Sequence, residues 1–432
     1  MFVARGSGYD YDSTWSEHRI SARISRIAAM PGDGLKAEVS VMLDGQPVLR
    51  TNPTLTSVSG MDGWYRKLQR RRPPKDYSID WEAYTEELAG LVIDARRQGS
   101  AASELDWDAQ QSDDVWLIEP YILKGTANLL YGDPGTAKSL LAMWFTALLS
   151  TGHVEPAHDL VAGRAKVLYL DYETSQDVVT RRMKWLHAGM GISDTAPTML
   201  YRYCVHPLAS EVDEIQDILE KRGWAADETL LVIDSQGLAT GGRLQDEEAV
   251  LAYFAALRAI GGTSLTISHT NKDGGLFGSQ YSLAATRNLW QAERSALDAG
   301  QLSVGLFHRK GNDVGREKPR PYQLNFSTDP ETGHTKSVAI KASATYGGSV
   351  AELTLRVVRE EAGVAREDLA TSVVNLAEKR PSEVRGAVAT ALSRHLRNGK
   401  LVEEGGVIQL PVPVKEPVKE PVQEESLWKT SV

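Results

Sequence analysis

The sequence predicts an α/β fold in which a mostly parallel sheet forms the central domain and a smaller unit lies on either side. Between residues 116 and 326, short apolar runs of strand character alternate with helical patterns, as in parallel sheets with crossover helices. Within this region, residues 132–139 read GDPGTAKS, after the apolar run 127–131 and before a second apolar run that starts at Leu140. A strand, a glycine-rich turn and a helix in this order are typical of phosphate binding.

Composition and charge restrict the class of protein. The 432 residues exceed one ordinary domain, and 42% apolar with 24% charged residues is typical of a globular protein. The net charge is −9, so nucleic-acid binding would need local basic patches. Cys204 is the one cysteine, which excludes an internal disulfide and fits a reducing compartment. Residues 1–6 lack a signal-peptide pattern and the longest apolar run, 140–149, is too short for a bilayer, so we expect a cytoplasmic protein without a membrane partner.

Residues 1–100 are expected to form a small α+β domain. Strand patterns occupy 20–27 and 37–43, and Asp80 is placed to cap a helix that runs to about residue 97. The basic run 66–75 is interrupted by prolines, and either a nucleic-acid contact or a solvated turn would explain it. The pattern does not indicate a function for this domain.

A linker rich in small and polar residues is expected at 101–115, followed by the core domain at 116–345. In the glycine-rich turn, backbone N–H groups and the helix N-terminus would face an anion. Lys138 would reach the β- and γ-phosphates, and the Ser139 hydroxyl would ligate Mg²⁺. Ala137 replaces the second glycine of the usual pattern, although alanine disfavours a positive φ. The alternative is an ordinary turn, but we expect ATP and Mg²⁺ to bind, with the nucleotide held by Gly132, Asp133, Pro134, Gly135, Thr136, Ala137, Lys138, Ser139 and Leu140.

Three polar residues stand at the ends of successive predicted strands. Ligands of open parallel sheets bind at the carboxyl ends of the strands, so these side chains should converge. Asp234 suits Mg²⁺ binding, and its alternative role is that of a strand-end cap. Glu173 would orient the water that attacks the γ-phosphate, or it is a surface carboxylate paired with a neighbouring arginine. His269 would contact the γ-phosphate or the water, or it is a buried histidine with a structural role.

A glycine-rich segment, 271–281, follows His269 and is predicted to be mobile. It contains Lys272, which could neutralise phosphate, and Phe277, which could stack on a base. The loop 237–243, which ends at Arg243, is a second candidate for DNA binding. Flexible surface loops are the alternative in both places.

Residues 350–411 are expected to form a third unit. Three helical patterns precede a hairpin that turns at Gly405-Gly406, and this order resembles a winged helix-turn-helix that would bind either DNA or protein. Residues 412–432 contain a repeated Pro-Val-Lys-Glu unit, which cannot form a packed core and is expected to be disordered. This tail is a candidate contact for replication proteins.

The ordered set GDPGTAKS, VLYLDYE, LLVID, TISHTNK and FHRKGN resembles RecA-like ATPases, and in pattern the RepA-type hexameric replicative helicases of plasmids and phages. The resemblance covers residues 116–326. It implies a RecA-like P-loop core, a homo-hexameric ring with ATP between subunits, and single-stranded DNA through its centre. By motif position, Glu173 is the catalytic glutamate, Asp234 the Walker-B acid and His269 the sensor. The rival AAA+ pattern places a glutamate beside the Walker-B acid, where this chain has Ser235.

The resemblance leaves the arginine finger unassigned. Some members place it before a Gly-Ser pair, where this chain has Phe277. Arg287 and Lys310 are the first substitutes, and Arg309 is a further one. We expect an ATP-hydrolysing oligomeric motor on single-stranded DNA, of the phage or plasmid replicative helicase type. The alternatives are a RecA-like recombination ATPase and a DNA-binding regulator switched by ATP.

Overall fold

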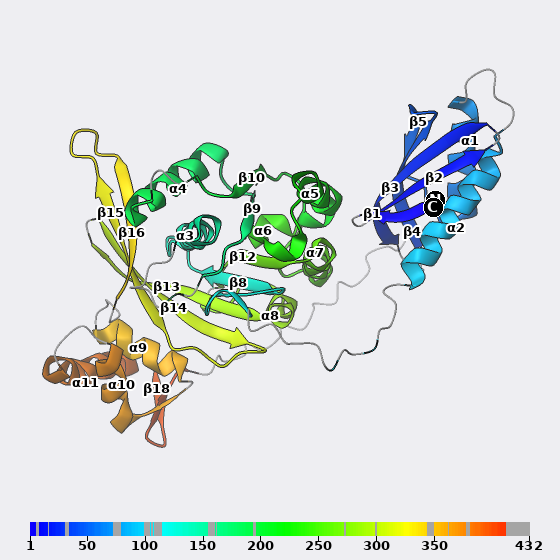
Figure 1. Ribbon diagram of the computed structural model, residues 1–432. Helices are drawn as coiled ribbons and strands as arrows, with labels where there is room; N and C mark the ends of the chain where they lie inside the picture. The colour runs from blue at the N-terminus through cyan, green and yellow to red at the C-terminus, as the bar shows by residue number, and fades with distance from the viewer. Residues whose placement is uncertain are drawn as a thin grey trace, which may run out of the picture. The chain divides into compact units, whose positions relative to one another are not determined.

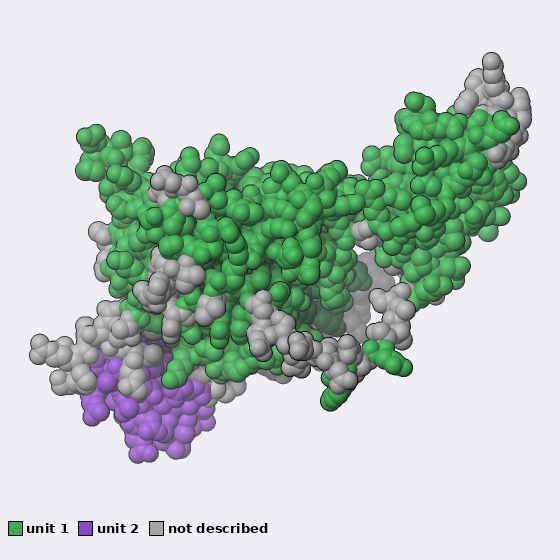
Figure 2. Space-filling view, in the orientation of Figure 1, with its two compact units in different colours: residues 1–343 green, residues 344–432 purple. Residues whose placement is uncertain are grey.

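The computed structural model divides the chain into two compact units, residues 1–343 and 344–432 (Figures 1 and 2). Within the described part of the chain, no helix is long and apolar enough to cross a membrane. The expected tail and nearly all of the expected linker lie outside the described residues. The structure describes residues 1–5, 8–15, 17–30, 34–71, 79–98, 104, 107, 115–153, 160, 162–192, 196–271, 274–298, 300–343, 350–361, 363–376 and 381–411.

The first unit begins with an antiparallel sheet, which confirms the small mixed N-terminal domain (Figure 1). Ile20, Ala22 and Ile24 on one face are buried against two helices, because alternate residues of a strand face opposite sides. Asp80 caps the second helix as predicted, its Oδ1 accepting from the amides of Glu82 (3.1 Å) and Ala83 (3.0 Å). The elements are β1 (Phe2–Arg5), β2 (Gly8–Trp15), β3 (His18–Met30), β4 (Gly34–Leu43), β5 (Gln46–Thr51), α1 (Val58–Arg71) and α2 (Trp81–Gln98).

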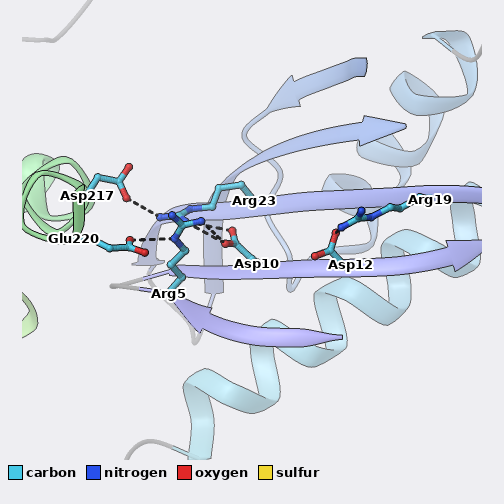
Figure 3. A network of polar contacts seen from close by, with 7 residues as sticks. All are labelled: Arg5, Asp10, Asp12, Arg19, Arg23, Asp217 and Glu220. Atoms are coloured by element: carbon cyan, nitrogen blue, oxygen red, sulfur yellow. Dashed lines mark hydrogen bonds and ion pairs between the residues drawn. The ribbon is translucent and has the colours of Figure 1, made fainter. Parts of the chain in front are cut away.

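The other face of this sheet carries ion pairs (Figure 3). Asp10 on β2 pairs with Arg5 at 3.1 Å and with Arg23 at 3.3 Å. The same two arginines reach helix α5 (Leu208–Arg222), where Arg5 meets Glu220 at 3.2 Å and Arg23 meets Asp217 at 3.4 Å (Figure 3). The described part of the basic run 66–75 is the end of helix α1, so an exposed turn is not its structure.

The core of the first unit is a nine-stranded sheet in the order β10-β9-β11-β12-β8-β13-β14-β15-β16. Every neighbouring pair from β10 to β13 is parallel, as the sequence predicts, and every pair from β13 to β16 is antiparallel. The strands are β8 (Ala127–Gly132), β9 (Lys166–Asp171), β10 (Met199–Tyr203), β11 (Thr229–Asp234), β12 (Thr263–His269), β13 (Asn288–Asp298), β14 (Gln301–Gly311), β15 (Arg320–Thr328) and β16 (Thr335–Ala342).

Helices cover both faces of the parallel part of the sheet. Helices α3 (Lys138–Thr151) and α4 (Gln176–Met190) share one apolar core with it, and α5 and α7 (Glu247–Ile260) share another. This sandwich buries β8 between β12 and β13 and fixes the position of the turn that follows Gly132. Short elements complete the unit: β6 (Trp116–Ile118), β7 (Ile122–Leu123), α6 (Gln236–Ala239) and α8 (Gln280–Ala285).

The second unit has the element order helix, strand, helix, helix, strand, strand, which is that of a winged helix. Its small sheet has the order β17-β19-β18, and the hairpin turns at Gly405 (φ +59°) and Gly406 (φ +80°), as predicted. The elements are α9 (Val350–Glu360), β17 (Val364–Ala365), α10 (Arg366–Leu376), α11 (Pro381–Arg397), β18 (Val402–Glu404) and β19 (Val407–Gln409).

Candidate nucleotide-binding site

The glycine-rich turn leaves β8 at Gly132 and enters α3 at Lys138. Gly132 cannot carry a side chain without local movement, because a Cβ there would lie 2.3 Å from the carbonyl oxygen of Ala292 on β13. Gly135 has φ +80°, a conformation that glycine adopts freely. Ala137 also has a positive φ, +59°, so alanine occupies the left-handed conformation that we expected it to avoid. This conformation costs a non-glycine residue about 1–2 kcal/mol, and such strain is often found at functional sites.

Lys138 lies within this turn and is almost fully buried. Its Nζ donates to the carbonyl oxygens of Gly132 and Asp133, both at 2.9 Å. Burial lowers the pKa of Lys138, and nearby carboxylates, above all that of Asp234, oppose this shift. The loop therefore holds a cation that can exchange these two bonds for bonds to a phosphate.

Asp234 ends β11 and is only 4% exposed. Its Oδ2 accepts a hydrogen bond from the Tyr169 hydroxyl at 2.7 Å, whereas Oδ1 has no hydrogen-bond partner among the described residues. Burial raises the pKa of Asp234, and the neighbouring hydroxyls of Tyr169 and Ser139 partly oppose this. The Oδ1 atom of Asp234 and the nearby hydroxyl oxygen of Ser139 are oxygen ligands of the kind that Mg²⁺ prefers.

Glu173 lies on the turn after β9, and Asp171 shapes that turn. The Asp171 Oδ1 accepts from the amides of Glu173 (3.0 Å) and Thr174 (2.9 Å). The carboxylate of Glu173 accepts a hydrogen bond from the Ser235 hydroxyl, and its Oε1 lies 3.9 Å from Nε2 of His269. The nearby side chain of His269 is the main cause that lowers the pKa of Glu173, so this carboxylate is ionised at neutral pH. The three strand-end residues predicted from the sequence therefore converge beside the glycine-rich turn.

After β12, the described residues 274–277 turn back antiparallel to residues 269–271, and we call this segment the hairpin. Asn271 N donates to Gly275 O at 2.8 Å, and Phe277 N donates to His269 O at 2.9 Å. Gln291 on β13 binds Gly274 O at 3.0 Å through its Nε2. Thr270, at the base of the hairpin, donates from its hydroxyl to the Asp133 carboxylate in the glycine-rich turn. The hairpin is thus bonded to both β13 and this turn.

The predicted DNA-binding residues occupy different surroundings. Phe277 is half-buried and packs against the apolar core shared with α5 and α7. Arg243 is exposed, and the next residue, Leu244, accepts a hydrogen bond from Ser279 N at 2.7 Å, which places Arg243 near the end of the hairpin segment. Lys272 lies outside the described residues.

The candidate arginine-finger residues are not at this chain's own glycine-rich turn. The amide of Arg287 donates to Ala127 O at 2.9 Å, at the start of β8, whereas the turn follows the end of β8. The Nζ of Lys310 donates to the carbonyl oxygens of Leu283 (2.6 Å) and Thr286 (2.8 Å) and so caps helix α8. Burial, with the nearby charge of Arg287, lowers the pKa of Lys310. A role for either residue in catalysis would require a second subunit.

Three residues that organise the site were not predicted from the sequence. They are Tyr169, which binds Asp234, Asp171, which shapes the turn of Glu173, and Ser235, which binds Glu173. The signal for Asp171 was present, because an aspartate at a strand end often accepts from the amides two and three residues later. No comparable signal marked Tyr169 or Ser235.

The family described as an AAA domain matches residues 95–275, which include the glycine-rich turn and all three strand-end residues. In the sheet, β11 and β12 separate β9 from β8, and Glu173 follows β9, whereas Ser235 follows Asp234 at the end of β11. The chain contains a RecA-like P-loop ATPase domain. Domains of this kind bind a nucleotide, typically with Mg²⁺, and the P-loop is the turn 132–139.

Among the solved structures similar to the chain is the flagellar accessory protein FlaH from Methanocaldococcus jannaschii. The identity is 13%, the match covers 51% of this chain and 90% of that chain, and the TM-score is 0.30. Similarity of this degree carries no information on function. No curated protein matches the sequence.

Proposed function

We propose that this protein is an ATP-hydrolysing oligomeric motor that acts on single-stranded DNA, of the replicative helicase type. The observation that carries the proposal is the bonded connection between the P-loop and the hairpin after β12. Asp133 of the P-loop binds Thr270, and the hairpin that starts there approaches the exposed Arg243. A change at the nucleotide would therefore move a surface segment that is suited to contact a polynucleotide.

In the proposed reaction, the residues around the P-loop have separate tasks. Lys138 and the P-loop amides bind the β- and γ-phosphates, and Glu173 orients the attacking water and accepts its proton. His269, near Glu173, senses the γ-phosphate and transmits its loss through Thr270 to the hairpin. Ser139 and Asp234 would hold Mg²⁺, which neutralises charge on the phosphates when bound.

The proposal includes a homo-oligomer, with six subunits by resemblance. Within one chain, Arg287 lies at the opposite end of β8 from the P-loop. In a head-to-tail ring, that end of one subunit would face the P-loop of the next, so Arg287 is the first candidate for the finger. Lys310 is the second, although it already caps α8.

A second candidate function is a DNA-binding regulator that ATP switches. The C-terminal unit has the element order of a winged helix, and Arg385, Arg394 and Arg397 on α11 are exposed. Basic side chains along a helix that follows two others are typical of helix-turn-helix recognition. The single-stranded DNA motor is preferred because Lys138, Glu173 and Asp234, which have hydrolytic roles in the proposed reaction, lie close together.

The experiment measures ATP hydrolysis with and without single-stranded DNA, unwinding of a forked duplex, and particle shape with an ATP analogue. The proposal expects DNA-stimulated hydrolysis, ring-shaped particles and unwinding. Long filaments on single strands without unwinding would select a recombination ATPase. Binding of specific duplex sites with negligible turnover would select the regulator.

A further inference from the structure

Strand β13 runs past the P-loop at close range. Its residue Ala292 is the last to pair with β8, where its partner is Gly132. The carbonyl oxygen of Ala292 is so close to Gly132 that it leaves no room for a Cβ there. The residues of β13 after Ala292 therefore continue along the side of the P-loop.

Arg294 follows two residues later and reaches the P-loop. A methyl group on Gly135 would lie 3.6 Å from Nη1 of Arg294. This places a guanidinium beside the middle of the P-loop, on the side from which β13 approaches. This residue was not among those predicted from the sequence.

Among the described residues, none neutralises the charge of Arg294. The side chain is exposed, and no described residue forms an ion pair or hydrogen bond with it. Its neighbour Glu293 pairs with Arg309 at 3.1 Å instead. An arginine without a partner beside a phosphate-binding loop is suited to bind a phosphate, because its planar fork matches two phosphate oxygens.

The sheet order indicates which end of the nucleotide Arg294 would meet. Asp234 and His269 end β11 and β12, on one side of β8, and Glu173 follows β9 on the same side. These groups surround the position of the γ-phosphate in the proposed reaction. Arg294 belongs to β13, on the opposite side of β8. A triphosphate laid across the P-loop would therefore present its α- and β-phosphates to Arg294.

We propose that Arg294 is an in-cis binding residue for the α- and β-phosphates of the nucleotide. This inference rests on nucleotide binding at the P-loop as stated in the proposed function. It adds a cation from the same chain to a site whose trans-acting cation is expected from a second subunit. Because ATP and ADP share these phosphates, Arg294 should hold both.

The test measures equilibrium binding of fluorescent ATP and fluorescent ADP, with Mg²⁺, to the full chain and to Arg294→Ala. Loss of a charge-assisted hydrogen bond should weaken both affinities by roughly ten- to a hundredfold. Arg294→Lys should recover part of the loss. Arg316→Ala is the matched control, because Arg316 is also exposed but follows Gly311, which pairs with Asn288 at the far end of β13.

Equal affinities of wild type and Arg294→Ala would overturn the inference. A loss confined to ATP would also overturn it, because it would place the contact at the γ-phosphate. If the wild type binds neither nucleotide, the proposed function fails first. A wild type that binds both, with an unaffected Arg294→Ala, contradicts only the role of Arg294.

Discussion

Replacing Glu173 by glutamine separates nucleotide binding from hydrolysis. The Glu173 carboxylate accepts from the Ser235 hydroxyl, and neighbouring groups lower its pKa, so the wild type presents an ionised base at neutral pH. Glutamine keeps the shape and one acceptor oxygen for Ser235 but cannot accept a proton from water. A positioned general base contributes roughly 10²–10⁴ in rate, which is about 3–5 kcal/mol of barrier. Glu173→Gln should therefore reduce turnover by this factor.

The assay compares phosphate release at saturating ATP and Mg²⁺ with binding of fluorescent ATP. Binding should be retained or slightly tighter, because the substitution removes a negative charge near the phosphates. Glu228→Gln is the control: Glu228 pairs with Lys166 at 3.1 Å beside the start of β11, at the opposite end of the strand from Asp234. Turnover of Glu173→Gln within about twofold of wild type, a difference of about 0.4 kcal/mol, would refute the assignment.

Two further predictions concern residues that shape the site. Burial raises the pKa of Asp234 in the folded state above its unfolded value of about 3.9. Because the folded state then holds the proton more tightly, the free energy of unfolding falls as pH rises from about 3.9 to the raised pKa. Above the raised pKa, this loss of stability is complete. Asp234→Asn should therefore raise the melting temperature of the nucleotide-free protein at pH 7–8 but abolish Mg²⁺-dependent hydrolysis; a lower melting temperature would contradict this. Gly132→Ala forces a Cβ against the carbonyl of Ala292 and should destabilise by about 1–3 kcal/mol and weaken ATP binding. In thermal unfolding, Gly63→Ala on α1 is its control, because nothing lies within 4 Å of the added methyl.

Much of the fold follows from local patterns. The buried strands β8, β9, β11 and β12 are short apolar runs, and their order with the intervening helices predicts a parallel sheet. Strands β1, β2 and β16 were not predicted. In β2, Asp10 and Asp12 face arginines on neighbouring strands, so cross-strand ion pairs stabilise a segment whose own sequence lacks an apolar run.

The part of the candidate site that could be predicted from the sequence consists of polar residues at the ends of predicted strands. Glu173, Asp234 and His269 could be placed because each ends or follows a strand of the parallel sheet. The roles of Ser235 and Arg294 depend on distances between strands that are far apart in the sequence. No local pattern shows how far β13 continues beyond the P-loop.

The most direct test of the account is Mg²⁺-dependent ATP hydrolysis by the full chain and by Lys138→Ala, with circular dichroism to check folding. The account predicts that the wild type hydrolyses ATP and that Lys138→Ala folds but has lost turnover, because Lys138 is the cation inside the P-loop. Unchanged hydrolysis in Lys138→Ala, or a wild type without affinity for ATP, would contradict the assignment of the P-loop as the catalytic site.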